Sequence, residues 1–501
     1  MVIVLKSNYE NFGFKRKSGI LMPIISLPSP YGIGSFGKGA YDFIDFLSET
    51  GQKCWQVLPL NPTSFGDSPY QSPSSKAGNP YFIDLDILKE EGLLTSEELN
   101  EVKTDTKKVD YGWLFYSRYS ILKRAYSRFE HDAKYNAFCR KNANWLEDHA
   151  LFMALKVKHN YTPWTEWAEE FRNVKLARAH ARELRAETDF QKWIQYEFFK
   201  QWKAVREYAK AKKILIIGDT PIYVAHDSVD VWAAPDQFLL DERYMPTIVA
   251  GCPPDAYAED GQLWGNPIYD WEKMKKDGFS WWIDRVAAAF EMYDILRIDH
   301  FRGFASFFTI PYGDKNARGG SWMDAPGIQL FDAIKASLPK SKIIAEDLGF
   351  ITDDVRELLK ASGFPGMKVL QFAFYGEDSE YLPRTYTTDN CVVYSGSHDA
   401  DCTRSWYSQL KGDALKRFKK ECPREKGQSA VEATISLAMR SRANLCVIPM
   451  QDYLELQNAE GRMNTPSTSE GNWCWRISPR YATEKLKNKI RALTEEGKRS
   501  T

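Results

Sequence analysis

The chain has 501 residues, and its 67 Lys and Arg balance 67 Asp and Glu, so the formal net charge is zero. This balance argues against a nucleic-acid partner, because binding phosphates requires an excess of basic side chains. Hydrophobic residues make up 43% of the chain and charged residues 27%, as in an ordinary globular protein.

No segment approaches the roughly 20 apolar residues that a membrane span requires. The N-terminal stretch has only a short apolar run before Lys6, which makes a poor signal peptide. The eight cysteines are scattered without a Cys-x-x-Cys pair, which argues against a zinc site and a disulfide framework. We therefore expect a cytoplasmic protein with no membrane partner.

Eight short apolar runs are each followed by a polar residue, Gly or Pro. They span residues 19–24, 53–58, 214–217, 295–298, 342–345, 367–372, 391–394 and 445–448. Near-continuous apolar runs are typical of buried parallel strands, and most of these are separated by enough chain for a helix. The pattern predicts an α/β fold, a (β/α)8 TIM barrel that forms a single catalytic domain over residues 1–501.

The interval between the second and third predicted strands, residues 59–211, is too long for a simple crossover. Residues 59–86 are rich in Pro, Gly and Ser and predict a loop, whereas residues 87–211 predict helices, one of them with a Thr95–Glu98 capping box. An aromatic stripe recurs at helical spacing and predicts packing between helices. Its members are Phe190, Trp193, Ile194, Phe198, Trp202, Val205 and Ala209.

Acidic side chains follow five of the predicted strands. They are Asp219, Asp299, Glu346, Asp399 and Asp452. One acid at a strand end is usually a helix cap, but five at one barrel mouth repel each other and are hard to explain as caps. Because barrel enzymes carry their chemistry at this end, we expect the acids to converge on a functional site.

Arg297 and Asp299 lie two residues apart on a predicted strand and therefore face the same side. The guanidinium favours an ionised carboxylate, which suits a nucleophile, and Glu346 could face it across the mouth. Two carboxyl groups ~5–5.5 Å apart are typical of retaining glycosidases, in which the acid/base needs a raised pKa that nearby negative charge would supply. His398 and Asp399 could hold sugar hydroxyls. For any one of these residues, a cap or a surface ion pair is the alternative.

Residues 250–270 form a Gly- and Pro-punctuated segment that carries Tyr257, Gln262 and Trp264. Such a loop suits a mobile lid that excludes water, although a plain connecting loop has the same composition. There is no P-loop, dinucleotide fingerprint or His-Glu-x-x-His motif. Ser397, His398 and Asp399 are contiguous, so they do not form a hydrolytic triad.

Several long segments resemble those of the amylomaltase family of the α-amylase clan, the disproportionating enzymes or 4-α-glucanotransferases of glycoside hydrolase family 77. They include PSPYGIGSFG, LPLNPTSFGDSPYQSPSSKAGNPY, IGDTPIYVAHDSVDVWA, GCPPDAYAEDGQLWGNPIYDW, LRIDHFRGF, IAEDLG, YSGSHDADCTRSW, RMNTP and GNWCWR, and the similarity covers about residues 19–476. The resemblance implies that Asp299 is the nucleophile, Glu346 the general acid/base and Asp399 a transition-state stabiliser.

The resemblance also implies a set of substrate-binding residues. They are Tyr70, Asp219, Tyr257, Gln262, Trp264, Asn266, Arg297, His300, His398 and Asn464. It implies no metal, no cofactor and no separate C-terminal β-domain. The expected substrates are maltooligosaccharides or other α-1,4-glucans, with glucose as an acceptor, and the expected state is a monomer or homodimer.

Two positions depart from the family pattern, with Ala400 where Asn is common and Tyr375 where Asp is common. These departures bear on acceptor preference and chain length. Two further hypotheses remain open from the residues, namely an α-1,4-glucan hydrolase with the same catalytic residues and an inactive glucan-binding protein. The second predicts loss of a catalytic carboxyl group, yet Asp299 and Glu346 are both present.

Overall fold

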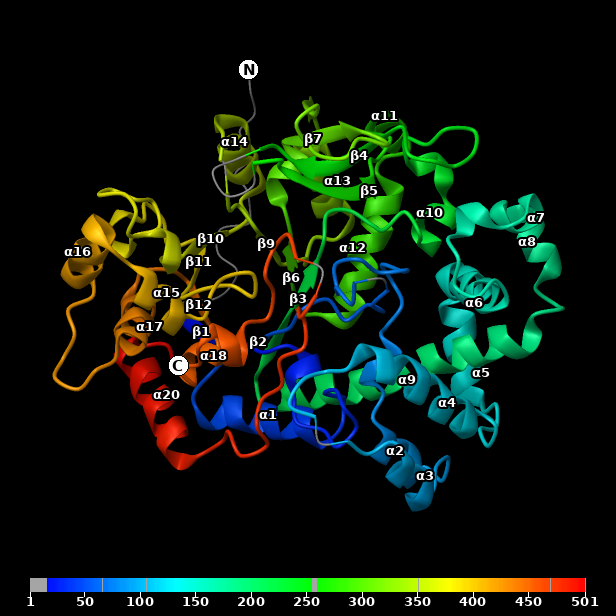
Figure 1. The fold of residues 1–501 in the computed structure, drawn as a ribbon, viewed down its shortest axis with the longest axis horizontal. Coiled ribbons are helices and arrows are strands. Elements are labelled where there is room, and N and C mark those ends of the chain that lie inside the picture. The colour runs from blue at the N-terminus through cyan, green and yellow to red at the C-terminus, as the bar shows by residue number, and fades with distance from the viewer. Residues whose placement is uncertain are drawn as a thin grey trace.

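A closed barrel of eight parallel strands forms the centre of the computed structural model, which describes residues 16–64, 66–104, 106–254, 259–349, 351–468 and 470–500 (Figure 1). The strands are β1 (Lys17–Leu21), β2 (Cys54–Gln56), β3 (Leu215–Thr220), β6 (Ile295–Ile298), β9 (Ile343–Ala345), β10 (Gly366–Val369), β11 (Cys391–Tyr394) and β12 (Leu445–Pro449). Each coincides with a predicted apolar run, with ends shifted by a few residues. The predicted (β/α)8 barrel is confirmed.

The barrel strands are buried on both faces, which explains their continuous apolar runs. Side chains such as Ile217, Ile295 and Ile344 fill the barrel interior, whereas Ile216 and Ile298, which alternate with them, pack outward against the helices. The pairing of β3 with β6 sets Asp219 opposite Arg297, and the pairing of β6 with β9 sets Ile298 opposite Ala345. The residues that follow these strands therefore meet at one end of the barrel.

Helices cover the outside of the barrel. They include α1 (Lys38–Glu49), α12 (Ser280–Met292), α13 (Gly327–Ser337), α14 (Asp353–Ser362), α15 (Thr403–Gln409), α16 (Gly412–Glu421), α17 (Ala430–Arg440) and α20 (Glu484–Glu496). One connection differs from the ideal pattern. Between β10 and β11, residues 370–390 are all described and contain only two short 3-10 helices, at Leu370–Phe372 and Pro383–Thr385.

The long interval between β2 and β3 folds as predicted, into a loop followed by helices beside the barrel (Figure 1). The main helices are α2 (Leu85–Glu90), α3 (Ser96–Glu101), α4 (Tyr111–Tyr126), α5 (Ala133–Lys141), α6 (Ala143–Lys158) and α9 (Arg185–Ala211). The Thr95–Glu98 capping box is present. The aromatic stripe is buried along α9 and packs the helices together, as expected.

A second sheet replaces much of the loop expected at residues 250–270. It is antiparallel, in the order β5-β4-β7-β8, with β4 (Ile248–Cys252), β5 (Gln262–Pro267), β7 (Ser306–Pro311) and β8 (Ser321–Asp324). The two ends of the expected loop are thus strands, and Tyr257 lies outside the described residues. Gly and Pro within residues 251–267 indicated a loop, although β4 itself contains a short apolar run at residues 248–250.

Gly218 on β3 allows close packing beneath the barrel mouth. A Cβ at this position would lie 2.1 Å from the ring of Tyr293, whose hydroxyl holds the Leu60 backbone N–H at 3.1 Å. We therefore expect Gly218→Ala to lower the free energy of unfolding by about 1–3 kcal/mol, as overpacking in a rigid core does. Denaturant unfolding measures this effect. Gly376→Ala is the matched control, because a Cβ there meets nothing closer than 3.9 Å, and equal stability losses in both variants would contradict the expectation.

Candidate active site

A buried arginine links two carboxylates at the ends of β3 and β6. Arg297 Nη1 lies 2.7 Å from both carboxylate oxygens of Asp219, and Nη2 lies 2.9 Å from Asp299 Oδ1. Burial disfavours the cation, but Asp219 and Asp299 outweigh it and raise the pKa of Arg297. The predicted shared orientation of Arg297 and Asp299 is confirmed, and Asp299 remains 28% exposed beside a permanent positive charge.

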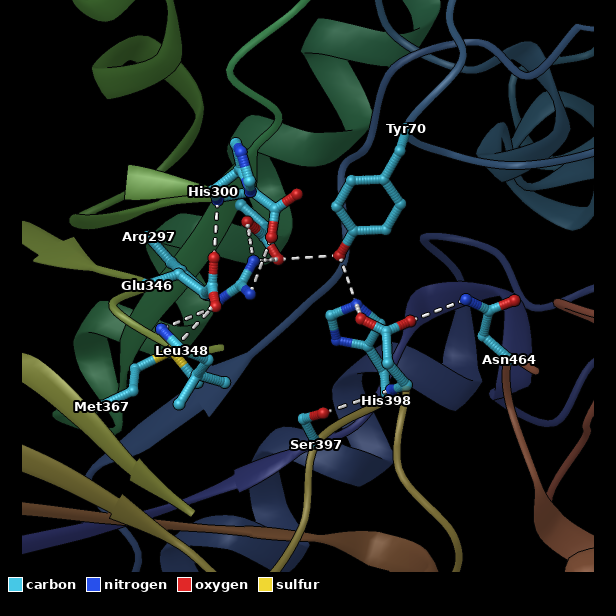
Figure 2. A network of polar contacts seen from close by, with 12 residues as sticks. Tyr70, Arg297, His300, Glu346, Leu348, Met367, Ser397, His398 and Asn464 are labelled. Atoms are coloured by element: carbon cyan, nitrogen blue, oxygen red, sulfur yellow. Dashed lines mark hydrogen bonds and ion pairs between the residues drawn. The ribbon is translucent and has the colours of Figure 1, made fainter. Parts of the chain in front are cut away.

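Glu346 ends the next strand and points toward the same space (Figure 2). Its Oε2 accepts the His300 backbone N–H at 2.7 Å and its Oε1 accepts the Leu348 N–H at 3.1 Å. Burial raises the pKa of Glu346 well above its usual value, and the charge of Asp299 adds to the effect. The sequence anticipated the negative neighbour but not that burial is the larger cause. The result is a carboxyl group poised to keep a proton.

Asp399, which follows β11, has surroundings that lower its pKa, in contrast to those of Glu346. Its Oδ2 lies 3.1 Å from Nε2 of the buried His398, and its Oδ1 accepts Asn464 Nδ2 at 2.7 Å. Burial raises the pKa of Asp399, but His398 and Asn464 outweigh it and bring the pKa down to about 2. The side chain is 42% exposed, so an ionised carboxylate faces the open mouth.

Tyr70, from the loop between β2 and β3, connects Asp219 with His398 (Figure 2). Its hydroxyl lies 2.8 Å from Asp219 Oδ2 and 2.9 Å from His398 Nε2, and its ring stacks on the His398 ring at 5.4 Å. Because the single O–H donates to Asp219, the proton between Tyr70 and His398 belongs to Nε2. This assignment agrees with the raised pKa of His398, for which Asp399 outweighs burial.

The β5 strand brings aromatic and amide side chains close to His300, the residue that follows Asp299. The Trp264 ring meets the His300 ring edge-on at 4.8 Å, and Trp264 Nε1 donates to Gln262 Oε1 at 3.0 Å. Burial lowers the pKa of His300 to about 4, so its imidazole is neutral at neutral pH. Asn266, predicted to bind substrate, uses its side-chain amide for contacts within the protein. Its Nδ2 donates to Val224 O at 2.9 Å, and the amide also pairs with that of Gln71.

The expectation that five acids converge on the mouth is wrong for Asp452. Its carboxylate is buried and accepts Ser395 Oγ at 2.6 Å, the Thr403 N–H at 2.8 Å and Thr403 Oγ1 at 2.7 Å. Ser395 begins the loop after β11, and Thr403 is the first residue of α15, where that loop ends. Asp452 therefore anchors that loop, which is the capping role that a lone acid at a strand end usually has.

Sequence reasoning missed Trp473, whose ring lies 5.7 Å from Tyr70 and 6.1 Å from His398. Its only signal was the aromatic segment GNWCWR, far away in the chain. The two departures from the family pattern lie at the surface or near it. Tyr375 is 61% exposed, and Ala400 follows Asp399 with its N–H 3.3 Å from Ser397 O.

A (β/α)8 barrel whose mouth holds an arginine-paired carboxylate, a carboxyl group with a raised pKa and a third, ionised carboxylate defines the class of carbohydrate-active barrel enzymes that work with paired carboxyl groups. Residues 22–483 match the model of glycoside hydrolase family 77, described as 4-alpha-glucanotransferase. The chain belongs to this family, and it is an enzyme of this type.

Its relatives match over nearly their whole length. A 4-alpha-glucanotransferase of Clostridium butyricum is 46% identical over 94% of this chain and 99% of its own, and one of Thermus thermophilus is 43% identical over 96% and 98%. The amylomaltase of Streptococcus agalactiae, solved in complex with acarbose, is 40% identical with a TM-score of 0.93, covering 97% of this chain and 100% of that one.

Among the described residues, no helix is long and apolar enough to cross a bilayer, and no group of three or more His, Cys, Asp or Glu side chains is placed to hold a metal ion. All eight cysteines are free thiols.

Tyr70→Phe removes the hydroxyl that joins Asp219 to His398. We expect a loss of about 1–3 kcal/mol in the free energy of unfolding, because Asp219 is left buried with one donor fewer, together with a clear fall in activity. Denaturant unfolding and a transfer assay measure the two effects. Tyr31→Phe is the control, since it breaks a Tyr–Asp hydrogen bond to Asp86 of 2.6 Å outside the site. Equal losses of activity in both variants would argue against a site role for Tyr70.

Proposed function

We propose that the protein transfers α-1,4-glucan segments from a donor to the 4-hydroxyl of an acceptor, by a double displacement that retains the anomeric configuration. The observation that carries this proposal is a pair of carboxyl groups in different surroundings: Asp299 is ion-paired with Arg297, whereas Glu346 has a raised pKa. Membership of the 4-α-glucanotransferase family supports transfer over hydrolysis.

In the first step, the Asp299 carboxylate attacks the anomeric carbon while Glu346 donates its proton to the departing 4-oxygen. A covalent glucosyl ester with Asp299 forms and the shortened glucan leaves. In the second step, the Glu346 carboxylate takes the proton from an acceptor 4-hydroxyl, which attacks the anomeric carbon and releases Asp299. The bond broken and the bond formed are alike, so the reaction needs neither an energy source nor a cofactor.

The remaining residues position and stabilise the sugar. Ionised Asp399 accepts hydrogen bonds from sugar hydroxyls and stabilises the positive charge that develops at the transition state, and His398 Nε2 holds the Asp399 carboxylate in place. Arg297 holds the Asp299 carboxylate in place through their ion pair. His300, Tyr70, Asp219 and Asn464 support this arrangement through the contacts described above.

The hairpin of β4 and β5 is the proposed mobile cover of the acceptor side. Trp264 and Gln262 project from β5 beside His300, where a closing cover would exclude water from the covalent intermediate. Tyr257, which the resemblance assigns to the same loop, lies outside the described residues. Exclusion of water is what separates transfer from hydrolysis, since both use the same carboxyl groups.

The proposed substrates are maltooligosaccharides and other α-1,4-glucans, with glucose able to serve as an acceptor. The eight free thiols favour a reducing compartment such as the cytoplasm. The enzyme acts as a monomer or homodimer.

Maltotriose as the only substrate tests transfer directly. We expect glucose together with a ladder of longer maltooligosaccharides, because each donated maltosyl or glucosyl unit lengthens another chain. Chromatography of the products measures this result. Glucose and maltose without lengthening would establish a hydrolase instead. Asp299→Asn is the matched variant, and it should abolish turnover because an amide does not form the glucosyl ester.

The pH dependence tests the role of Glu346. Glu346 must carry its proton to act as an acid, so kcat/KM should fall as the pH rises through its folded-state pKa, which burial places above the usual value. Glu346→Gln should remove this alkaline limb and lower activity on maltotriose by about 10²–10⁴-fold, the range for general acid–base catalysis.

A donor whose leaving group needs no proton separates this role from simple misfolding. With maltosyl fluoride, Glu346→Gln should still release fluoride at a substantial rate, because Asp299 remains. If fluoride release is as impaired as activity on maltotriose, Glu346 is not the acid.

A further inference from the structure

The loop after β11, residues 395–403, carries His398 and Asp399 into the mouth, so the position of Asp399 depends on how this loop is held. Asp452 fixes its two ends through Ser395 and Thr403. The stretch between these anchors, which includes the 42% exposed Asp399 side chain, needs support of its own.

Asp401 supplies that support on the outer side of the loop. Its Oδ1 accepts Asn458 Nδ2 at 2.8 Å and also pairs with Arg462, and its Oδ2 accepts Gln409 Nε2 at 3.0 Å. Its backbone oxygen accepts Gln371 Nε2 at 2.8 Å. The Asp401 side chain is only 18% exposed and that of Arg462 26%, so this is a shielded, multiply bonded pair and not a loose surface ion pair.

Arg462 extends the connection back to the carboxylate in the mouth. Its Nε donates to Asn464 O at 3.0 Å, and Asn464 in turn donates Nδ2 to Asp399 Oδ1 at 2.7 Å and its N–H to His398 O at 3.2 Å. Figure 2 shows Asn464 reaching toward the His398 region from its own segment. The contacts close a ring from Asp399 through Asn464, Arg462 and Asp401 back to the same loop.

We propose that Asp401 and Arg462 are positioning residues for the proposed transferase reaction, acting on Asp399 through Asn464. In the proposed mechanism neither residue contacts the sugar. Together they fix the amide that orients the Asp399 carboxylate, which must be in place before the transition state forms. A preorganised charge loses much of its effect when it shifts by a fraction of an ångström. The proposal rests on the function assigned to Asp399 above.

The test compares kcat and KM for maltotriose disproportionation in Arg462→Gln and Asp401→Asn with the parent enzyme. We expect kcat to fall by about 10–100-fold, the scale of a misplaced catalytic group, with KM changed by less than about 3-fold. Arg442→Gln is the matched control, because Arg442 also donates to a backbone oxygen, Tyr386 O at 3.2 Å, but precedes β12 at the other end of the barrel. Its kcat should not change.

A double-mutant cycle distinguishes positioning from a general structural role. If Arg462 acts through Asn464, the double variant Arg462→Gln/Asn464→Ala should lose no more activity than Asn464→Ala alone. Losses that multiply would overturn the proposal, as would an unchanged kcat in a well-folded Arg462→Gln.

Arg462→Lys covers the case in which Arg462→Gln does not fold. A lysine keeps the charge beside Asp401 but cannot also hold Asn464 O with a second, fixed N–H. It should therefore fold and still lose kcat, and full kcat in this variant would overturn the proposal. If the parent enzyme itself fails to lengthen maltotriose, the proposed transfer function is wrong, which is a distinct outcome.

Discussion

The buried Arg297, shared between Asp219 and Asp299, is the interaction on which the rest of the site depends. A guanidinium that is almost wholly withdrawn from water is costly unless its charge is matched and its N–H groups are bonded. The pairing of β3 with β6 sets Asp219 directly opposite Arg297, so the barrel register itself supplies the first partner. Asp299, two residues further along the strand, supplies the second. The proposed nucleophile is thus held by the same charge that the fold needs to neutralise.

The three carboxyl groups of the mouth differ through their surroundings and not through their chemistry. Asp299 lies against Arg297, Glu346 is partly buried beside a negative neighbour, and Asp399 lies between His398 and Asn464. Their environments therefore suit the three carboxyl groups to the three roles proposed for them, namely nucleophile, proton carrier and fixed negative charge. Tyr70 joins two of these surroundings, because its hydroxyl contacts both Asp219 and His398. A change at one group is consequently transmitted to the other.

The sequence was sufficient where the signal is local. Buried parallel strands have continuous apolar runs, so all eight barrel strands were found, and a two-residue spacing was enough to place Arg297 beside Asp299. It was insufficient where distant segments decide the outcome. In the sequence Asp452 resembles an acid of the site, but its carboxylate accepts hydrogen bonds from Ser395 and Thr403. Trp473 is far from Tyr70 in the chain and contacts it only in the folded structure. The second sheet was not predicted because Gly and Pro between residues 251 and 267 indicated a loop, and the apolar runs of β4 and β7 are only two or three residues long.

The helical insertion holds the loop between β2 and β3 by hydrogen bonds from two side-chain amides to the loop backbone. On α9, the Gln195 amide both accepts from and donates to the backbone of Gly78, at 2.7 and 3.0 Å, and Gln201 does the same for Asp84, at 2.7 and 3.4 Å. These paired contacts hold the C-terminal part of the loop that carries Tyr70. The aromatic stripe packs α9 against its neighbours, so the amides are rigidly placed. The insertion therefore restrains the segment that follows Tyr70 at Gly78 and Asp84, and thereby limits how far the loop that carries the Tyr70 hydroxyl can move.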